Sequence, residues 1–417
     1  MSAPLRIGFV GGGFITRFHL QSLVAVRDCV VAGVSSRSRA SAEETAALAR
    51  SLEVGPQARA FASTEELAAS PEVDALWICA RNDTRLQVLD EILEGAARRS
   101  TPLRGVALEK PLARNLAEAR AVLERVERLG CPHGYLEDML FAPHLVRGKE
   151  VLWRRAVPLA GRPFLARAAE EHAGPHSAWF WQPGIAGGGV LLDMMCHSLE
   201  AARWLLTAPG APRDSLTPVE VVAVCENLKW TLPKYRERLR RRFGPEVDWE
   251  HHPSEDFTRA TIRWRTEEGQ EVLTETTSSW CFTGAGLRHT FEVAGPEYSL
   301  EANLAETGLR VFLGREIQGE AGEDLVEKQN AEQGLMPVSP DEPSTYGYVG
   351  ENRHFVRAFL GREPVGLDFR DGLEVVRLMM ACYRSAEEKC AVDPGDPSLE
   401  GYRPPAARAA EGTGAAS

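Results

Sequence analysis

Residues 5–16 read LRIGFVGGGFIT, a short apolar run that breaks into three glycines and leads into the helix-like segment at 17–23. This order predicts a strand, a tight turn and a helix. Gly11 allows the sharp turn, and Gly13 allows the backbone to approach a pyrophosphate at the helix N-terminus, where N–H groups and partial positive charge favour anions. Thr16 stands where the dinucleotide fingerprint has its third glycine. The stretch predicts a dinucleotide site.

The end of the next apolar run, CVVAGV at 29–34, bears on the choice of dinucleotide. In the NAD-type fingerprint an Asp or Glu at this point hydrogen-bonds the ribose 2′-hydroxyl. This chain has Ser35, Ser36 and Arg37 instead, and small hydroxyls beside a guanidinium suit a 2′-phosphate that an acid would repel. The sequence therefore favours NADP. NAD stays open, because Arg37 also fits a solvated loop.

A second motif follows the apolar strand expected at 104–108, which leads into Glu109, Lys110 and Pro111. Ligands of an open parallel sheet bind at the carboxyl ends of its strands, and proline favours an extended conformation for the residue before it. The Lys110 ammonium is thus placed to point toward a ligand. A surface charge pair of Glu109 and Lys110 is the alternative.

A third motif is GGGVLLDMMCH at 187–197, in which Asp193 and His197 stand four residues apart. Residues with this spacing lie on one face of a helix, so a carboxylate and an imidazole are available as a proton-transfer pair. Cys196 would point away from that face and is not expected to be a nucleophile. Taken alone, the pair also fits an ordinary solvated helix.

The order of apolar segments predicts the fold class. Strands are expected at 5–10, 29–34, 75–80 and 104–108, alternating with helices at 40–52, 84–98 and 115–129. Such βαβ units form a doubly wound parallel sheet, the Rossmann arrangement. Further strand-like runs, with fewer helices between them and an apparent insertion at 229–256, are expected at 162–169, 219–228, 257–265, 271–280, 287–294 and 308–313.

Three regions are predicted from these patterns. Residues 1–132 would form the NAD(P)-binding Rossmann domain, and residues 133–402 a substrate-binding and oligomerisation domain of the α+β class. Residues 403–417 are rich in Pro, Ala and Gly and would form a mobile tail.

The motifs together resemble the glucose-fructose oxidoreductase, inositol dehydrogenase and MocA family, in the family's order and approximate spacing. The resemblance spans nearly the whole chain and includes YGYVGENRHFVRAF at 346–359. It implies an NAD(P)-dependent oxidoreductase whose second domain is a large open, mainly antiparallel sheet backed by helices. It also implies a polyhydroxylated substrate (a sugar, cyclitol or glycoside) and a homo-oligomer, a dimer or tetramer formed over the open sheet face.

The chain departs from the family pattern after the strand expected at 75–80. Many members carry Pro-Asn and then a His there, whereas this chain has Arg81, Asn82 and later Arg85. The two arginines either favour an anionic ligand or are surface replacements. The cofactor contacts expected from the motifs and the resemblance are Gly11, Gly13, Phe14, Ile15, Ser35, Ser36, Arg37, Asn82, Glu109, Lys110 and Pro111.

Residues 171–181, EHAGPHSAWFW, are the candidates for the substrate pocket. Sugars are held by aromatic faces and by polar groups on their hydroxyls, so Trp179 would supply the first and His172 or His176 the second. The alternative is that the aromatic residues belong to the core and the histidines bond to backbone carbonyls.

Composition excludes several classes of function. The chain has 417 residues, of which 44% are hydrophobic and 26% charged, and its formal net charge of −11 offers no basic footprint for nucleic acid. No stretch approaches the roughly 20 apolar residues that span a bilayer. Residues 1–4 leave no room for a signal peptide before the first strand, so cytoplasmic residence is expected. The eight cysteines lie far apart without a Cys-x-x-Cys pair, so neither disulfides nor a metal is expected.

The predicted reaction joins these motifs. His197 removes the hydroxyl proton of a secondary alcohol as general base, and the carbon's hydride passes to the dinucleotide to leave a ketone. Lys110 stabilises the developing alkoxide charge, and Asp193 orients the substrate or tunes His197. Two alternatives stay open: a nucleotide-sensing protein of the same fold without turnover, and a glycoside-cleaving enzyme that recycles its bound cofactor.

Overall fold

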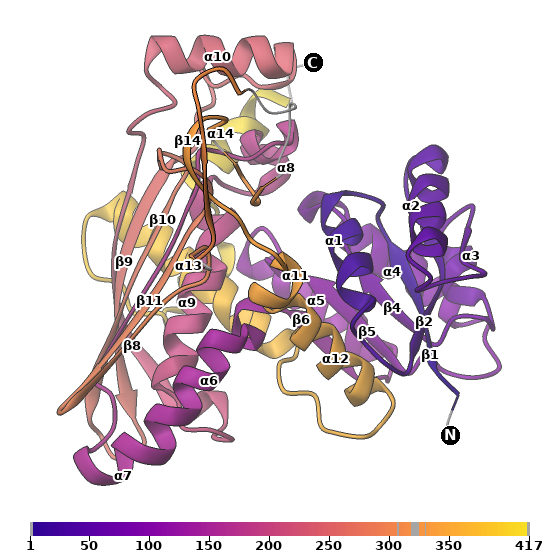
Figure 1. Ribbon diagram of the computed structural model, residues 1–417, viewed down its shortest axis with the longest axis horizontal. Coiled ribbons are helices and arrows are strands. Elements are labelled where there is room, and N and C mark those ends of the chain that lie inside the picture. The colour runs from indigo at the N-terminus through magenta and orange to yellow at the C-terminus, as the bar shows by residue number, and fades with distance from the viewer. Residues whose placement is uncertain (1–2, 307, 318–324, 330, 415–417) are drawn as a thin grey trace. The chain divides into compact units, whose positions relative to one another are not determined.

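The computed structural model describes residues 3–306, 308–317, 325–329 and 331–414 (Figure 1). The chain divides into two compact units. The first comprises Met1–Ala113, Ala117–Pro143 and Pro343–Glu374, and the second comprises Arg114–Leu116, His144–Glu342 and Val375–Ser417. The first unit thus includes a late segment that the contiguous division predicted from the sequence assigns to the second domain.

A six-stranded parallel sheet forms the first unit. Its strands are β1 (Leu5–Val10), β2 (Cys29–Ser35), β3 (Arg59–Ala60), β4 (Ala75–Ile78), β5 (Gly105–Glu109) and β6 (His133–Leu136), hydrogen-bonded in the order β3-β2-β1-β4-β5-β6. Its helices are α1 (Phe14–Leu23), α2 (Arg39–Ser51), α3 (Thr64–Ala69), α4 (Arg85–Ala96), α5 (Leu116–Arg128), α11 (Glu342–Thr345) and α12 (Tyr348–Phe359). The predicted doubly wound sheet is confirmed. The strand order reverses beside β1, and ligands of such sheets bind at that point.

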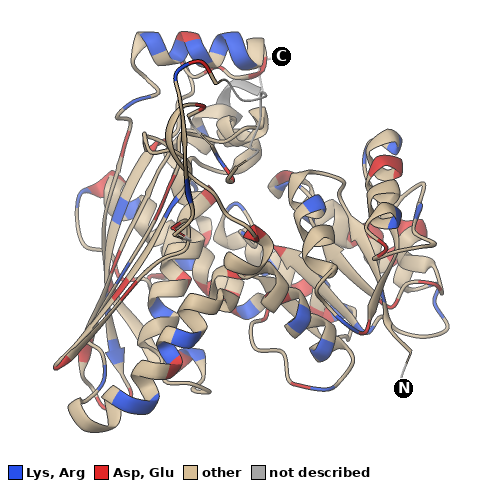
Figure 2. Ribbon diagram, viewed as in Figure 1, with Lys and Arg blue, Asp and Glu red and all other residues tan. Residues whose placement is uncertain are grey.

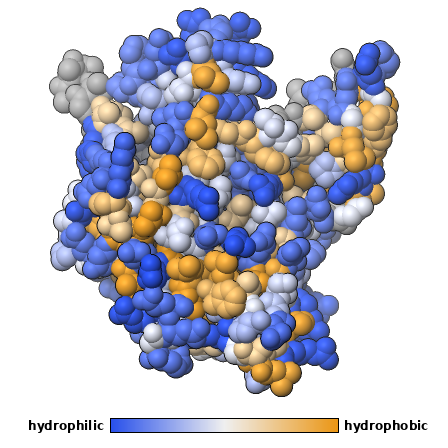
Figure 3. Space-filling model, turned by 90° about the vertical axis from the view of Figure 1, so that its left-hand side faces the viewer, coloured by the Kyte–Doolittle hydropathy of each residue, from blue (hydrophilic) through white to orange (hydrophobic). Residues whose placement is uncertain are grey.

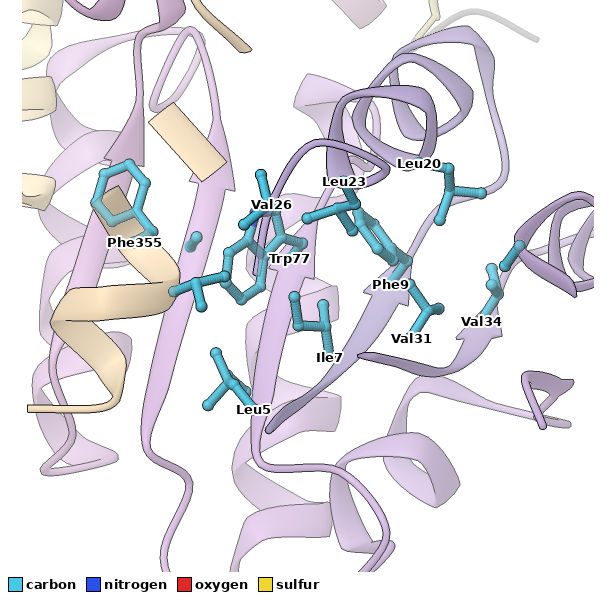
Figure 4. Packing of buried hydrophobic residues seen from close by; sticks show 14 of the residues in the cluster. Leu5, Ile7, Phe9, Leu20, Leu23, Val26, Val31, Val34, Trp77 and Phe355 are labelled. Atoms are coloured by element: carbon cyan, nitrogen blue, oxygen red, sulfur yellow. The ribbon is translucent and has the colours of Figure 1, made fainter. Parts of the chain in front are cut away.

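Strand β6 and helix α12 complete this unit beyond the boundary predicted at residue 132. Val106 of β5 pairs with His133 of β6. Two strand glycines make room for α12, because a Cβ on Gly105 would lie 2.3 Å from the Phe359 ring and one on Gly134 would lie 2.2 Å from the Phe355 ring. Both phenylalanines join the buried cluster that includes Trp77 (Figure 4).

The second unit is built on a second six-stranded sheet. Its strands are β7 (Leu165–Glu171), β8 (Leu216–Glu226), β9 (Phe257–Thr266), β10 (Glu271–Ser279), β11 (Arg288–Gly295) and β12 (Tyr298–Asn303), in the order β12-β11-β7-β10-β9-β8. Only β7 and β10 pair in parallel, so the predicted mainly antiparallel sheet is confirmed. Strands β13 (Arg310–Leu313) and β14 (Gly334–Pro337) form a separate two-stranded antiparallel sheet. The helices are α6 (Pro143–Val151), α7 (Val157–Ala160), α8 (Pro183–Ala186), α9 (Val190–Leu206), α10 (Pro233–Phe243), α14 (Pro405–Gly414) and α13 (Phe369–Glu388), which begins in the first unit.

The large sheet has an inner and an outer face because side chains alternate along its strands. On β9, Ile262 and Trp264 are buried beneath the inner layer that includes α9, whereas Arg263 and Arg265 point outward. Arg263 pairs with Glu271 of β10 at 2.9 Å. Figure 2 marks basic residues in blue and acidic residues in red along the ribbon. On the face drawn in Figure 3, apolar patches lie among mostly hydrophilic side chains.

One segment differs from its expectation, because α14 forms most of the tail expected to be mobile. Helix α10 lies within the predicted insertion at 229–256. Alanine favours helix formation, and Ala407 is buried while Arg408 pairs with Glu387 of α13, so this part of the tail is held in place. All eight cysteines are free thiols. Within the described residues, no helix combines the length and apolar character that crossing a membrane requires.

Candidate functional site

The loop after β1 requires glycine at residue 11. Gly11 has φ +108°, and a Cβ there would lie 2.6 Å from the carbonyl oxygen of Cys79 at the end of β4. Its N–H donates to the carbonyl oxygen of Ser35, at 2.8 Å. A side chain would therefore push the loop away from the carboxyl ends of β2 and β4.

The N-terminus of α1 opens from this loop. Gly13 is the N-cap residue and has no side-chain oxygen to offer the first N–H groups, and a Cβ built on it would meet no atom within 4 Å. An anion has room to approach the first turn, which Phe14 and Ile15 begin. Thr16, in the place of the usual third glycine, is buried and donates from Oγ1 to the carbonyl oxygen of Gly11 at 2.8 Å. Thr16 in the place of the third glycine therefore stabilises the glycine loop by this hydrogen bond.

The residues that follow β2 differ in exposure. Ser35 is buried, with its Oγ 3.5 Å from the Thr64 hydroxyl, whereas Ser36 is half-buried and Arg37 is exposed. Of the three residues predicted to read a 2′-phosphate, Ser36 and Arg37 are therefore the two that a ligand can reach.

Glu109 is not part of a surface charge pair. Its side chain is buried, and Oε1 lies 2.8 Å from Nε2 of His19 on α1. Its Oε2 accepts a hydrogen bond from the backbone N–H of Lys110 at 3.1 Å. One carboxylate thus ties the helix behind the glycine loop to the residue that carries the candidate ammonium. Lys110 is half-buried and is joined to Pro111 by a cis peptide bond.

Asn352 fixes the tautomer of His19. The Trp77 indole donates to Asn352 Oδ1 at 2.9 Å, so the amide nitrogen faces His19 Nδ1, also at 2.9 Å. His19 Nδ1 therefore accepts, and Nε2–H donates to Glu109. The adjacent Glu351 is buried, and burial followed by the charge of Glu109 raises its pKa well above the ordinary value.

The two arginines that depart from the family pattern have separate partners. Arg85 is buried, and its guanidinium donates to the carbonyl oxygen of Lys110 at 3.1 Å and to that of Ala80 at 3.4 Å. It joins the ends of β4 and β5 and is not a surface replacement. Arg81 forms an ion pair with Asp83 at 2.7 Å, and Asn82 between them is buried.

Helix α9 carries Asp193 in its first turn and His197 one turn later. His197 is buried and Asp193 is half-buried. The two residues before this helix must be glycine because neighbouring atoms leave no room for a Cβ. A Cβ on Gly188 would lie 2.1 Å from the Tyr383 hydroxyl, and one on Gly189 would lie 2.2 Å from the carbonyl oxygen of Glu255.

A carboxylate from elsewhere in the chain caps α9. Glu255 Oε1 accepts hydrogen bonds from the backbone N–H groups of Gly189 and Leu191, each at 3.0 Å, and from the Tyr383 hydroxyl at 2.6 Å. Burial raises the pKa of Glu255 to about 7, and these donors oppose that rise. Sequence reasoning assigned no role to Glu255 or Tyr383, because the contact between them joins positions far apart in the sequence.

The segment at 171–181 mixes core and accessible residues. His172 is buried, and its Nδ1 accepts from the Gly174 N–H at 2.9 Å. The Lys328 ammonium lies 2.7 Å from Nδ1 of His176; burial, then Lys328 and Arg242, lower the pKa of His176 to about 3. Trp179 is half-buried and stacks on Phe180, with ring centroids 3.7 Å apart.

The structure thus gathers Gly11, Gly13, Phe14, Ile15, Ser36, Asn82, Glu109 and Lys110 at the carboxyl edge of the first sheet. Asp193, His197, His172, His176 and Trp179 belong to the second unit.

Two family models match the chain. The model described as "Oxidoreductase family, NAD-binding Rossmann fold" matches residues 5–135, and "Oxidoreductase family, C-terminal alpha/beta domain" matches residues 166–393. Among curated proteins, 1,5-anhydro-D-fructose reductase of Ensifer adhaerens is 28% identical over 222 residues, covering 52% of this chain and 59% of the relative. Inositol 2-dehydrogenase of Agrobacterium fabrum is 30% identical over 205 residues, covering 48% and 54%. The chain thus spans little more than half the length of these relatives.

Solved structures share the fold across nearly the whole chain. GenD2 from gentamicin A biosynthesis, in complex with NAD, superposes with a TM-score of 0.73 at 24% identity and covers 94% of this chain and 97% of that one. Levoglucosan dehydrogenase, in complex with NADH and levoglucosan, gives a TM-score of 0.67 at 21% identity and covers 94% and 100%.

Proposed function

We propose that this chain, which belongs to the glucose-fructose oxidoreductase, inositol dehydrogenase and MocA family, is an NAD(P)-dependent dehydrogenase or reductase. It would transfer a hydride between the dinucleotide and a secondary alcohol or ketone of a sugar, cyclitol or glycoside. The observation that carries the proposal is the open α1 N-terminus at the switch point of the parallel sheet, with Lys110 at the same edge. The relatives named for inositol and anhydrofructose support the substrate class.

The residues at the glycine loop fit a dinucleotide. Gly13 leaves space for a pyrophosphate, and the N–H groups of the first turn of α1 would bind it. Within this proposal NADP is favoured over NAD, since Ser36 and Arg37 stand at the end of β2 where an NAD-type site has an acid. A guanidinium pairs well with a phosphate dianion.

A bound nicotinamide ring accepts or supplies the hydride. Lys110, positioned through the Glu109 carboxylate, would donate a hydrogen bond to the reacting oxygen and stabilise its developing negative charge. His197 would take the hydroxyl proton during oxidation and return it during reduction, and Asp193 would orient the substrate or raise the basicity of His197. These are roles for one lysine, one histidine and one carboxylate.

The segment at 171–181 would hold the substrate. The stacked pair of Trp179 and Phe180 offers a half-buried aromatic surface for C–H groups of a sugar ring. His172 accepts at Nδ1 within its own turn, so its neutral ring carries the proton on Nε2, and His176 is neutral because its pKa is depressed. Both histidines would therefore hydrogen-bond hydroxyls as neutral groups.

We also propose that the protein forms a homo-oligomer over the outer face of the large sheet and resides in the cytoplasm. Val222, Val224 and Leu273 are large apolar residues exposed on the outward side of β8 and β10, which supports a second copy as the partner. Sedimentation equilibrium would test the oligomer, and a single monomeric species at micromolar concentration would contradict it. Cell fractionation would test the location.

The function is tested by binding and turnover. Purified full-length protein is titrated with NADH and NADPH by fluorescence, then mixed with oxidised dinucleotide and a panel of sugars, cyclitols and glycosides while nicotinamide absorbance is followed. Binding with turnover of a panel member is expected. Binding without turnover on any compound would contradict the enzyme, and no binding would contradict the dinucleotide site.

A further inference from the structure

Asp193 accepts a hydrogen bond from a fully buried tryptophan. The Trp280 Nε1 lies 3.3 Å from Asp193 Oδ2, and Trp280 directly follows β10 with 0% of its surface exposed. Asp193 itself is half-buried. A rigid donor thus faces a carboxylate that a ligand can approach.

Trp280 belongs to a cluster of four indoles, here called the tryptophan cluster: Trp181, Trp230, Trp249 and Trp280. Its ring centroid lies 4.9 Å from that of Trp181 and 6.2 Å from that of Trp249. Its carbonyl oxygen accepts from the Trp230 indole at 2.8 Å. None of the four is more than 4% exposed, so the cluster is a support and not a surface for a ligand.

Half of this cluster comes from the insertion predicted at 229–256. Trp230 and Trp249 lie at its two ends, with α10 between them. The Asp256 carboxylate closes the insertion by accepting from the backbone N–H groups of residues 228, 229 and 230, at 2.7, 2.9 and 2.7 Å. The backbone carbonyl oxygen of Asp256 accepts from the backbone N–H of Trp280 at 2.8 Å. The insertion is therefore fastened to the residue that contacts Asp193.

We propose that Trp280 is a positioning residue for Asp193 and that the insertion holds its indole in place. The proposal deepens, and rests on, the function proposed above, in which Asp193 acts on the substrate or His197. A fixed N–H donor holds the carboxylate in one rotamer and favours its ionised form. Among the described residues of this unit, Glu255 and Tyr383 bond to the start of α9, and Lys149 of α6 donates to the carbonyl oxygen of Trp204 near its end. Arg213 pairs with Glu200 of α9. Further buried titratable groups on or beside the strands packed against α9 are Glu170 of β7, His172 after β7, Asp256 before β9 and His289 of β11.

The kinetic test compares two matched substitutions in one cluster. Trp280→Phe removes the donor to Asp193 and keeps an aromatic ring, whereas Trp249→Phe removes an indole whose buried Nε1 has no hydrogen-bond partner among the described residues. We expect Trp280→Phe to lower kcat/KM about tenfold or more, as for loss of a hydrogen bond to a charged group. The acidic limb of the kcat/KM–pH profile should move to higher pH. Trp249→Phe should leave the limb in place. Superimposable profiles for Trp280→Phe and the wild type would overturn the proposal.

A second measurement does not depend on turnover. The full-length protein is labelled with ¹⁵N in its nine tryptophan indoles, and the Trp280 signal is assigned from the Trp280→Phe variant. This signal is expected to move as Asp193 titrates and to lose that movement in Asp193→Asn. If no substrate turns over while the signal still follows Asp193, the proposed function fails and the positioning contact stands. A Trp280 signal that is unaffected by Asp193→Asn would overturn the inference even in an active enzyme.

Discussion

The difference in stability of the second unit between Glu255→Gln and the wild type should grow in favour of the variant as pH rises. Glu255 caps α9 from a buried position, and burial raises its pKa from 4.5 to about 7. A carboxyl whose pKa is raised on folding stabilises the folded state fully below the unfolded pKa. That stabilisation is lost as pH rises through the folded pKa. The wild type should therefore lose stability between about pH 4.5 and pH 7, as the buried carboxyl is forced to ionise.

The size of this loss follows from the shift. A change in pKa from 4.5 to about 7 corresponds to about 3 kcal/mol. The side-chain amide introduced by Glu255→Gln can still accept from the N–H groups of Gly189 and Leu191, but it has no proton to lose. For a unit of this size 1 kcal/mol moves the melting temperature by roughly 2–4 °C. The melting temperature of the variant minus that of the wild type should thus rise by roughly 6–12 °C from pH 4.5 to pH 8.

Differential scanning calorimetry of the two proteins at both pH values measures this difference, and titrations elsewhere in the chain cancel in the subtraction. Glu301→Gln, at an exposed position on β12, is the matched control and should show a difference independent of pH. A constant difference between Glu255→Gln and the wild type across this range would show that no buried, titrating carboxyl caps α9.

Three further predictions concern the first unit. Lys110→Ala should leave the Kd for dinucleotide within a few-fold and lower kcat by orders of magnitude, because it removes the group that faces the developing charge; unchanged kcat in stopped-flow assays would refute its role. Arg37→Ala should weaken NADPH much more than NADH in fluorescence titrations, and equal weakening would mean that the 2′-phosphate is not read there. His19→Leu should lower stability by about 1.5–3 kcal/mol, because the buried Glu109 carboxylate loses the hydrogen bond from His19, while His19→Gln should recover part of the loss; equal melting temperatures for all three proteins would contradict the network.

The sequence predicted those parts of the fold that local patterns encode. The apolar runs at β1, β2, β4 and β5 and the glycine loop after β1 led to the parallel sheet. Strand β6 was missed because its four residues, HGYL, make no apolar run, although Gly134 accommodates Phe355 of α12. The tail was expected to be mobile from its composition, but the helix propensity of its alanines and a pairing with Glu387 give α14.

The candidate site was predictable only where its residues are neighbours in sequence. Lys110 follows a strand, and Asp193 and His197 share one helix face, so each could be found from spacing. The residues that support them stand far away: His19 is 90 residues from Glu109, and Trp280 is 87 residues from Asp193. Such pairs are set by tertiary packing, which one sequence read along its length does not reveal.

In the proposed reaction a hydride passes between a substrate carbon and the dinucleotide. The most direct measurement incubates the protein and oxidised dinucleotide with cyclitols and sugars that carry deuterium on their carbinol carbons, and determines the mass of the reduced dinucleotide. We expect a reduced dinucleotide that carries one deuterium, formed by the wild type and nearly abolished in Lys110→Ala. Reduced dinucleotide without deuterium, or none formed by protein shown to bind the dinucleotide, would contradict it.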